Sequence, residues 1–165
     1  MKKIRGFEIV SKYENEELLL PKRATKGSAG YDLTAAVDIT VPSVFKALRM
    51  NNQSETNPMS STLVPTGVKA YMPDNEYLLL ANRSSNPMKK QLAVPNGIGI
   101  IDADYYGNEG NEGEIFVQFI NYGLEDVEIS KGERIAQGIF SRYEVVDDEE
   151  QTFDKRTGGF GSSGR

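Results

Sequence analysis

The stretch from Asn96 to Gly107 contains the residue types and the spacing that best suit binding and catalysis. Glycine has no Cβ, so Gly97 and Gly99 would let a planar ligand come close to the backbone, whose N–H and C=O groups could read its edge. Asp102 follows the apolar pair Ile100-Ile101, where partial desolvation of its carboxylate would favour a general base. The same spacing fits a plain β-hairpin with Asp and Gly at its turn, so the segment alone leaves both interpretations open.

Three further stretches could bind phosphate oxygens. Arg83-Ser84-Ser85 follows the apolar run Leu78–Ala81 and offers a guanidinium and hydroxyls for charge-assisted hydrogen bonds, although a surface turn is the commoner setting for such a tripeptide. The stretch Lys131–Gln137 could bind phosphate or could be a turn leading into a strand. The run Gly158–Gly164 could surround a phosphate with backbone N–H groups, although a Gly/Ser-rich end is typical of a disordered tail. Its spacing is not that of a P-loop.

The composition narrows the possible chemistry. The 165 residues include no Cys and no His, which excludes disulfides, thiol nucleophiles, His general bases and the usual zinc sites. Carboxylates, Tyr and Lys remain as titrating groups, and any metal is expected to be a hard, oxygen-bound ion. The net charge of −5 disfavours nonspecific nucleic-acid binding but permits a local basic pocket for a small polyphosphate.

The chain also shows no sign of a membrane protein. No apolar run approaches the ~20 residues of a membrane span, and Arg5 and Glu8 interrupt any signal-like stretch at the start. The sequence therefore predicts a soluble, cytoplasmic protein with no membrane partner.

The elements that must position these residues are expected to be β-strands almost throughout. The 16 glycines and 7 prolines between short apolar segments favour a sandwich or jelly roll. One helix is expected over Val44–Met50, within a single domain spanning 1–150, with a surface loop at 50–61 and a flexible tail at 151–165. The expected strands are Phe7–Val10, Leu63–Tyr71, Tyr77–Leu80, Gly97–Ile101, Ile115–Ile120, Val127–Ile129 and Arg134–Tyr143.

Five segments, in order along the chain, resemble the five motifs of the trimeric dUTPase family. The resemblance covers roughly residues 20–164. The stretches Ser28–Leu33 and Gly158–Ser162 are the specific ones, whereas Arg-Ser-Ser alone is not. The five segments are Ala24–Leu33, Arg83–Ser85, Asn96–Gly107, Gly132–Gln137 and Arg156–Gly164.

The resemblance implies an all-β, distorted jelly-roll β-barrel and a homotrimer whose active sites are shared between subunits. It implies hydrolysis of dUTP to dUMP and pyrophosphate by attack of water on the α-phosphate, with Mg²⁺ as cofactor. This reaction keeps uracil out of DNA and supplies dUMP for thymidylate synthesis. The tail at 151–165 would close over the active site.

The resemblance also implies a role for each matching residue. Asp102 would deprotonate the attacking water, Tyr105 would pack against the deoxyribose and exclude a 2′-hydroxyl, and Asp32 would support Mg²⁺ through water. The uracil readers would be Asn96, Gly99, Ile100, Ile101 and Phe116, the last on the returning strand. The phosphate ligands would be Arg83, Ser84, Ser85 and Gln137. The tail would contribute Phe160, stacked on the base, and Arg156 and Ser162, which would reach the terminal phosphate. Gly161 would be a further substrate contact.

The chain departs from the family pattern in three places. The connection from Asp32 to Arg83 is longer, the hairpin after Asp102 is lengthened by residues 108–114, and Lys155 stands where the family often has the tail arginine. Whether Lys155 or Arg156 meets the γ-phosphate is therefore open.

Two other functions stay open. A dCTP deaminase, alone or combined with dUTPase activity, has the same fold but needs different contacts to the base. A dUTP-responsive regulatory protein would use a surface such as the loop at 50–61.

Overall fold

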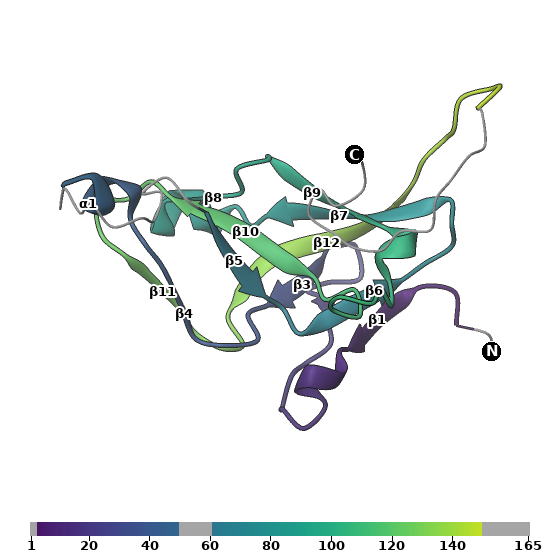
Figure 1. Ribbon diagram of the computed structural model, residues 1–165, viewed down its shortest axis with the longest axis horizontal. Coiled ribbons are helices and arrows are strands. Elements are labelled where there is room, and N and C mark those ends of the chain that lie inside the picture. The colour runs from purple at the N-terminus through teal and green to yellow at the C-terminus, as the bar shows by residue number, and fades with distance from the viewer. Residues whose placement is uncertain (1–2, 50–60, 150–165) are drawn as a thin grey trace.

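The structure, a computed structural model, describes residues 3–49 and 61–149 and is built almost entirely from antiparallel strands (Figure 1). The predicted all-β class is confirmed, and relatives of known structure share it. The expected tail at 151–165, with Arg156, Phe160, Gly161 and Ser162, lies outside the described residues, as does nearly all of the expected loop at 50–61.

The largest sheet has the strand order β2-β3-β12-β7-β9. Its strands are β2 (Lys22–Arg23), β3 (Tyr31–Thr34), β12 (Arg134–Arg142), β7 (Glu76–Asn82) and β9 (Ile98–Asp102). Side chains of β7 alternate between buried and half-buried positions, as expected for a strand with one face on a core. The strand β12 pairs with β3 on one side and, over Ala136–Arg142, with β7 on the other, and so forms the centre of the sheet.

A second sheet covers the inner face of the first. It contains β5 (Thr62–Pro65), β10 (Phe116–Asn121) and β8 (Leu92–Ala93), with β10 in the middle. Apolar side chains from both sheets form one buried core. Fully buried members include Leu33, Leu78, Val64, Phe119 and Ile135. Burial of these side chains supplies the main stabilisation that holds the two sheets together.

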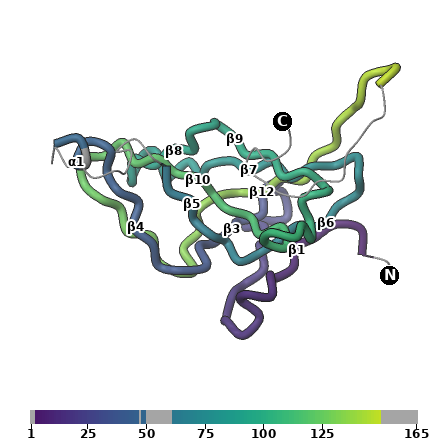
Figure 2. Tube along the Cα trace, viewed as in Figure 1, coloured from purple at the N-terminus to yellow at the C-terminus, as the bar shows by residue number. Residues whose placement is uncertain are grey.

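Two short strand pairs complete the fold. The strand β1 (Gly6–Ile9) pairs with β6 (Val68–Tyr71), and β11 (Val127–Ile129) pairs with β4 (Ile39–Val41). The second pair lies beside the helix α1 at one end of the molecule (Figure 1). The chain beyond β12, residues 143–149, extends away from the sheets (Figure 2).

The few helical segments are short. The helix α1 (Val44–Arg49) follows Ser43, whose Oγ accepts the N–H of Lys46 at 3.1 Å, a hydrogen bond typical of a helix N-cap. This helix confirms the one predicted from residue 44. Short turns of helix are η1 (Ser11–Tyr13), η2 (Asn86–Lys90) and η3 (Ala103–Tyr105). Within the part of the chain that the structure describes, no helix is long and apolar enough to cross a membrane.

The prediction of one strand over Leu63–Tyr71 was wrong. The chain breaks at Thr66-Gly67, where Gly67 has a φ of +68°, so that β5 and β6 belong to different sheets. A left-handed glycine ends regular pairing because the backbone turns out of the strand. The short strands β2, β3, β4 and β8 were not predicted.

Candidate functional site

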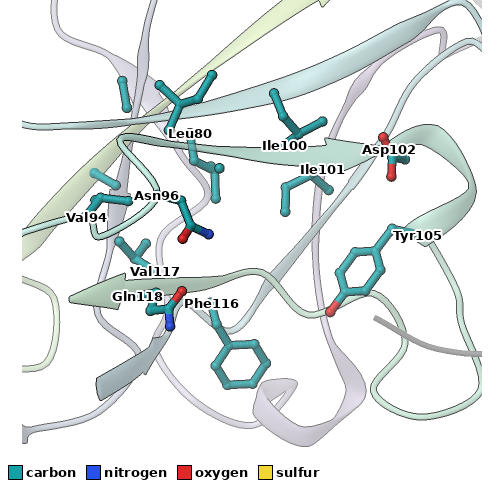
Figure 3. A pocket seen from close by; sticks show the side chains of 14 residues that line it. Leu80, Val94, Asn96, Ile100, Ile101, Asp102, Tyr105, Phe116, Val117 and Gln118 are labelled. Carbon is teal, nitrogen blue, oxygen red and sulfur yellow. The ribbon is translucent and has the colours of Figure 1, made fainter. Parts of the chain in front are cut away.

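A pocket of about 260 Å³ opens between β9 and β10 (Figure 3). Many of the predicted nucleoside contacts line it together. These are Asn96, Gly99, Ile100, Ile101, Asp102, Tyr105 and Phe116. The pocket has apolar walls with polar groups at its two ends, which is the usual character of a site for a small organic ligand.

One end of the pocket is formed by Asp102 and Tyr105 (Figure 3). Asp102 is the last residue of β9, and its side chain is exposed. The turn η3 follows immediately and brings the Tyr105 ring back to the same end. Tyr105 is only 5% exposed, and its hydroxyl donates a hydrogen bond to the carbonyl of Glu114 at 3.0 Å. An accessible carboxylate and an immobilised ring therefore lie side by side.

The other end of the pocket is lined by Asn96 and the start of β9. The turn before β9 depends on Gly97, which has a φ of +76° and donates its N–H to the carbonyl of Val94 at 2.9 Å. Gly99 serves close packing as well, because a Cβ there would come within 3.2 Å of the Leu80 Cβ. The glycines thus let β9 lie close to its neighbour while its backbone borders the pocket.

The returning strand β10 borders the opposite side of the pocket through Phe116 and Gln118. The Phe116 ring points away from β9 (Figure 3), so Phe116 would meet a ligand through its backbone. The Gln118 amide lies towards Asn96, and its Nε2 donates to the Ser61 Oγ at 2.5 Å. Sequence reasoning missed Gln118, although strict alternation along β10 places it on the same face as Phe116.

A second polar cluster surrounds Asp32 on β3. Its carboxylate, 9% exposed, lies 3.7 Å from the Arg83 Nε and 3.3 Å from the Arg134 Nη1, and it accepts from the Gln137 Nε2 at 3.3 Å. Gly30 makes this possible because a Cβ there would stand 3.0 Å from the Gln137 Cβ. The predicted phosphate ligands Arg83 and Gln137 and the predicted metal support Asp32 are therefore together.

The cluster also contains Arg134, which sequence reasoning did not select. Residues three apart on a regular strand point to opposite faces, yet Arg134 and Gln137 both reach Asp32. The pairing of β12 with β3 shifts register between Arg134 and Ala136, and such a bulge moves a side chain to the other face. The position of Arg134 within the segment Gly132–Gln137 was the available signal.

The predicted residues Ser84 and Ser85 lie directly after β7, next to this cluster in sequence. Ser84 is exposed and Ser85 is half-buried. Arg83, which precedes them, donates from Nη1 to the carbonyl of Arg134 at 3.1 Å. That bond ties the end of β7 to the start of β12 and orients the guanidinium.

Within one chain the pocket and the cluster are not one site. Gln137 pairs with Ala81, which pairs with Ile98, so the cluster lies level with the Asn96 end of the pocket. Asp102 lies four positions further along β9 (98 to 102), or about 13 Å. A nucleotide with its base near Asn96 and its sugar near Tyr105 would thus extend its phosphates away from the cluster of its own chain.

The donor groups limit how a metal could bind. Among residues 3–49 and 61–149, no group of three or more Asp, Glu, His or Cys side chains is placed to hold a metal ion. The Asp32 carboxylate already faces two guanidinium groups. This donor set fits only an ion held mainly by ligand oxygens and water, which is how Mg²⁺ commonly binds beside phosphates.

Comparison with known proteins identifies the family. Residues 16–164 match the dUTPase family. Deoxyuridine 5'-triphosphate nucleotidohydrolase of Lactococcus lactis is 47% identical over 163 residues, 98% of this chain and 99% of that protein. The crystal structure of dUTPase from Streptococcus mutans superimposes with a TM-score of 0.74 at 43% identity, over 86% of this chain and 98% of that one.

A more distant structure agrees in fold alone. It is the structure of a mutant dUTPase from phage phi11 of S. aureus, which was described for its coordination of a structural Mg(II) ion. Its TM-score is 0.64 at 19% identity, over 92% of this chain and 100% of that chain. On the strength of the family match and the closer relatives, this chain belongs to the dUTPase family.

Proposed function

We propose that the protein hydrolyses dUTP to dUMP and pyrophosphate by attack of water on the α-phosphorus. The observation that carries this proposal is the pocket between β9 and β10, which has Asn96 at one end and the pair Asp102 and Tyr105 at the other. That order corresponds to base, sugar and α-phosphate along a nucleotide. Family membership supports the same reaction.

The base is read at the Asn96 end. Backbone groups of Gly99, Ile100 and Ile101 and the backbone of Phe116 hydrogen-bond the uracil edge, together with the Asn96 side chain. A methyl group on C5 of the base would clash with these strands, so thymine would be rejected. The Tyr105 ring packs against C2′ of the deoxyribose and rejects a ribose.

The chemistry is assigned to Asp102. Its exposed carboxylate, next to the sugar position, orients a water and accepts its proton as the water attacks the α-phosphorus. Positioning and charge stabilisation provide most of the rate enhancement in phosphoryl transfer, so neither His nor Cys is needed.

The phosphate chain is held by the cluster around Asp32. Arg83, Arg134 and Gln137 donate hydrogen bonds to phosphate oxygens, with Ser84 and Ser85 beside them. Asp32 would hold Mg²⁺ through water, and the bound ion would further neutralise the phosphate charge. The tail residues Arg156, Phe160, Gly161 and Ser162, outside the described residues, would cover the base and the terminal phosphate.

The active site is proposed to be shared between subunits of a homotrimer. A nucleotide in the pocket points its phosphates away from the cluster of its own chain, so a neighbouring chain must supply that cluster. The outer face of the large sheet also exposes apolar side chains, with Ile98 47% and Ile100 49% exposed. Cross-strand neighbours share a face, so Leu79 and Ile139 continue this row beside Ile100. An apolar face of this kind is suited to contact with another copy.

Pyrophosphate release tests the proposed function. With Mg²⁺ present, dUTP should be hydrolysed, whereas dCTP, dTTP and UTP at equal concentration should not. The variant Asp102→Asn should still bind dUTP but lose about 100-fold or more in kcat, since the amide cannot accept the proton.

Two outcomes would contradict the proposal. Retained turnover in Asp102→Asn would reject the assigned base. Release of ammonia from dCTP would show a deaminase instead.

A further inference from the structure

The lengthened turn between η3 and β10, residues 106–115, holds the far end of Tyr105. The Tyr105 hydroxyl donates to the Glu114 carbonyl at 3.0 Å and accepts from the Asn111 Nδ2 at 2.8 Å. An amide nitrogen can only donate, so the phenol must be the acceptor towards Asn111, and its proton is directed to Glu114. Figure 3 shows this hydroxyl at the end of the ring that points away from Asp102.

The turn itself fixes the orientation of the Asn111 amide. The Asn111 Oδ1 accepts from the Asn108 Nδ2 at 2.7 Å and from the Gly113 N–H at 3.0 Å. Because two donors face one end of the amide, that end is the oxygen, and the nitrogen faces the phenol. The donor that meets Tyr105 is therefore set in place by the fold.

The backbone of Tyr105 is held by the same turn. Asn108 is buried, and its Nδ2 donates to the Tyr105 carbonyl at 3.2 Å. Gly113 has a φ of +84°, and a Cβ there would lie 2.5 Å from that same carbonyl. Only glycine lets the turn approach so closely, so both the backbone and the hydroxyl of Tyr105 are anchored by residues 108–114.

Glu112 attaches this turn to the rest of the protein. Its Oε2 accepts from the Lys69 Nζ at 3.1 Å and from the Ser11 Oγ at 3.0 Å. The Ser11 and Lys69 contacts hold the pKa of the Glu112 carboxyl below its ordinary value. These bonds connect the turn to β6 and to η1, so it is a supported element rather than a free loop.

We propose that Asn111 is a positioning residue that sets the sugar selectivity of the enzyme through Tyr105. This inference rests on the proposed function, in which the Tyr105 ring packs against C2′ of the deoxyribose. A steric filter works only if the ring cannot retreat, because a shift of about 1 Å would admit a 2′-hydroxyl. The hydrogen bond from Asn111 opposes that retreat, because it fixes the hydroxyl end of the ring, which points away from Asp102.

Four variants of the full-length protein test the proposal. Asn111→Leu removes the whole amide at similar size, both the donor to Tyr105 and the acceptor for Asn108 and Gly113. Tyr105→Phe removes the hydroxyl while keeping the ring. The double variant combines both. Glu109→Ala, which alters an exposed side chain of the same turn, is the matched control. For each protein, kcat/KM is measured separately with dUTP and with UTP.

Asn111→Leu should raise kcat/KM for UTP relative to dUTP about tenfold. Tyr105→Phe, which also loses the bond to the Glu114 carbonyl, should change the ratio at least as much. The double variant should add little to Tyr105→Phe, because the bond between Asn111 and Tyr105 is already lost there. Glu109→Ala should leave the ratio unchanged. A purely structural role would instead lower kcat/KM for both nucleotides alike.

The outcomes separate this proposal from the proposed function. Wild-type protein that does not hydrolyse dUTP rejects the proposed function. If the wild type does hydrolyse dUTP, either of two results rejects the role of Asn111. One is an unchanged ratio of kcat/KM for UTP and dUTP in Asn111→Leu, and the other is additive effects in the double variant. If Asn111→Leu does not fold, Tyr105→Phe decides, since an unchanged ratio there also overturns the proposal.

Discussion

At the scale of single residues, Glu114 is a buried carboxylate whose backbone also receives the Tyr105 hydroxyl. Burial raises the pKa of its carboxyl above the ordinary 4.5, and the nearby charge of Glu112 raises it further. The charge of Lys12 and the hydrogen bond that the carboxylate accepts from the Gly67 N–H act in the opposite direction but do not cancel the effect of burial. The folded protein therefore holds this proton more tightly than the unfolded chain does. Stability consequently rises as the pH falls through the raised pKa, and the ionised group opposes folding at neutral pH.

The substitution Glu114→Gln tests this charge. Glutamine keeps a carbonyl acceptor for the Gly67 N–H but removes the buried negative charge. At pH 7 the variant should melt about 2–4 °C above the wild type, and the difference should shrink as the pH falls through the raised pKa and the wild-type carboxyl takes up its proton. Thermal unfolding of both proteins across this range is the measurement. A variant that melts below the wild type at pH 7 would contradict the assigned effect of burial.

The sequence predicted some site residues and missed others for a physical reason. Asp102 and Tyr105 stand three positions apart, so a local turn is enough to bring them together. The contact between Arg134 and Asp32 joins residues 102 positions apart and depends on a bulge. Asn111 matters only through the hydrogen bonds of its turn. No local pattern in the sequence reports such contacts.

At the scale of elements, the irregular start of β12 gives the cluster around Asp32 its composition. The bulge before Ala136 turns Arg134 towards Asp32, while the regular pairing that follows places Gln137 there as well. Bulges commonly redirect a side chain at functional sites. The strand thus supplies two donors to one carboxylate and, in the proposed function, to one phosphate chain.

The variant Arg134→Met should lower kcat/KM for dUTP about tenfold through the loss of one charge-assisted contact. The fold should be preserved, because Asp32 keeps Arg83 and Gln137 as partners. Steady-state kinetics with thermal unfolding checks both statements. Lys46→Met, which removes a positive charge on α1 paired with Asp126, is the control and should change kcat/KM little. Equal losses in the two variants would show a nonspecific effect of charge.

The elements themselves were predictable to different degrees. Longer strands such as β7, β10 and β12 carry enough apolar periodicity to be predicted, with ends that differ by at most two residues. The break at Thr66-Gly67 depends on distant partners: the Thr66 Oγ1 donates to the Ile115 carbonyl at 2.6 Å, and the Gly67 N–H donates to Glu114 at 3.3 Å. Tertiary contacts therefore overrode a continuous strand pattern.

At the scale of the whole molecule, one chain presents two half-sites that point in different directions. The pocket ends in Asp102, while the Asp32 cluster lies level with the Asn96 end of the same sheet. In the proposed function, each half-site lacks what the other offers, namely the general base Asp102 or the phosphate-binding cations. In the proposed homotrimer, closed rotational symmetry would let each pocket meet the cluster of a neighbour, so that every half-site is used once.

Mixed oligomers test this arrangement. Asp102→Asn subunits keep the Asp32 cluster but lack the general base, and Arg83→Ala subunits keep the general base Asp102 but have a defective cluster. Each homogeneous protein should therefore be nearly inactive. When the two proteins are mixed equally and allowed to exchange subunits, about one quarter of the sites should combine an intact Asp102 from one chain with an intact Asp32 cluster from the next. The mixture should therefore recover about a quarter of the wild-type rate of pyrophosphate release.

The same experiment can contradict the shared site. If one chain supplied both the general base Asp102 and the Asp32 cluster, every site in the mixture would carry either the Asp102→Asn or the Arg83→Ala substitution. Activity would then stay at the level of the two parents at any mixing ratio. Because subunit exchange is required, the mixture must also be shown to contain hybrids, for example by mass spectrometry of differently tagged chains. Hybrids without recovered activity would place the whole catalytic apparatus within one subunit.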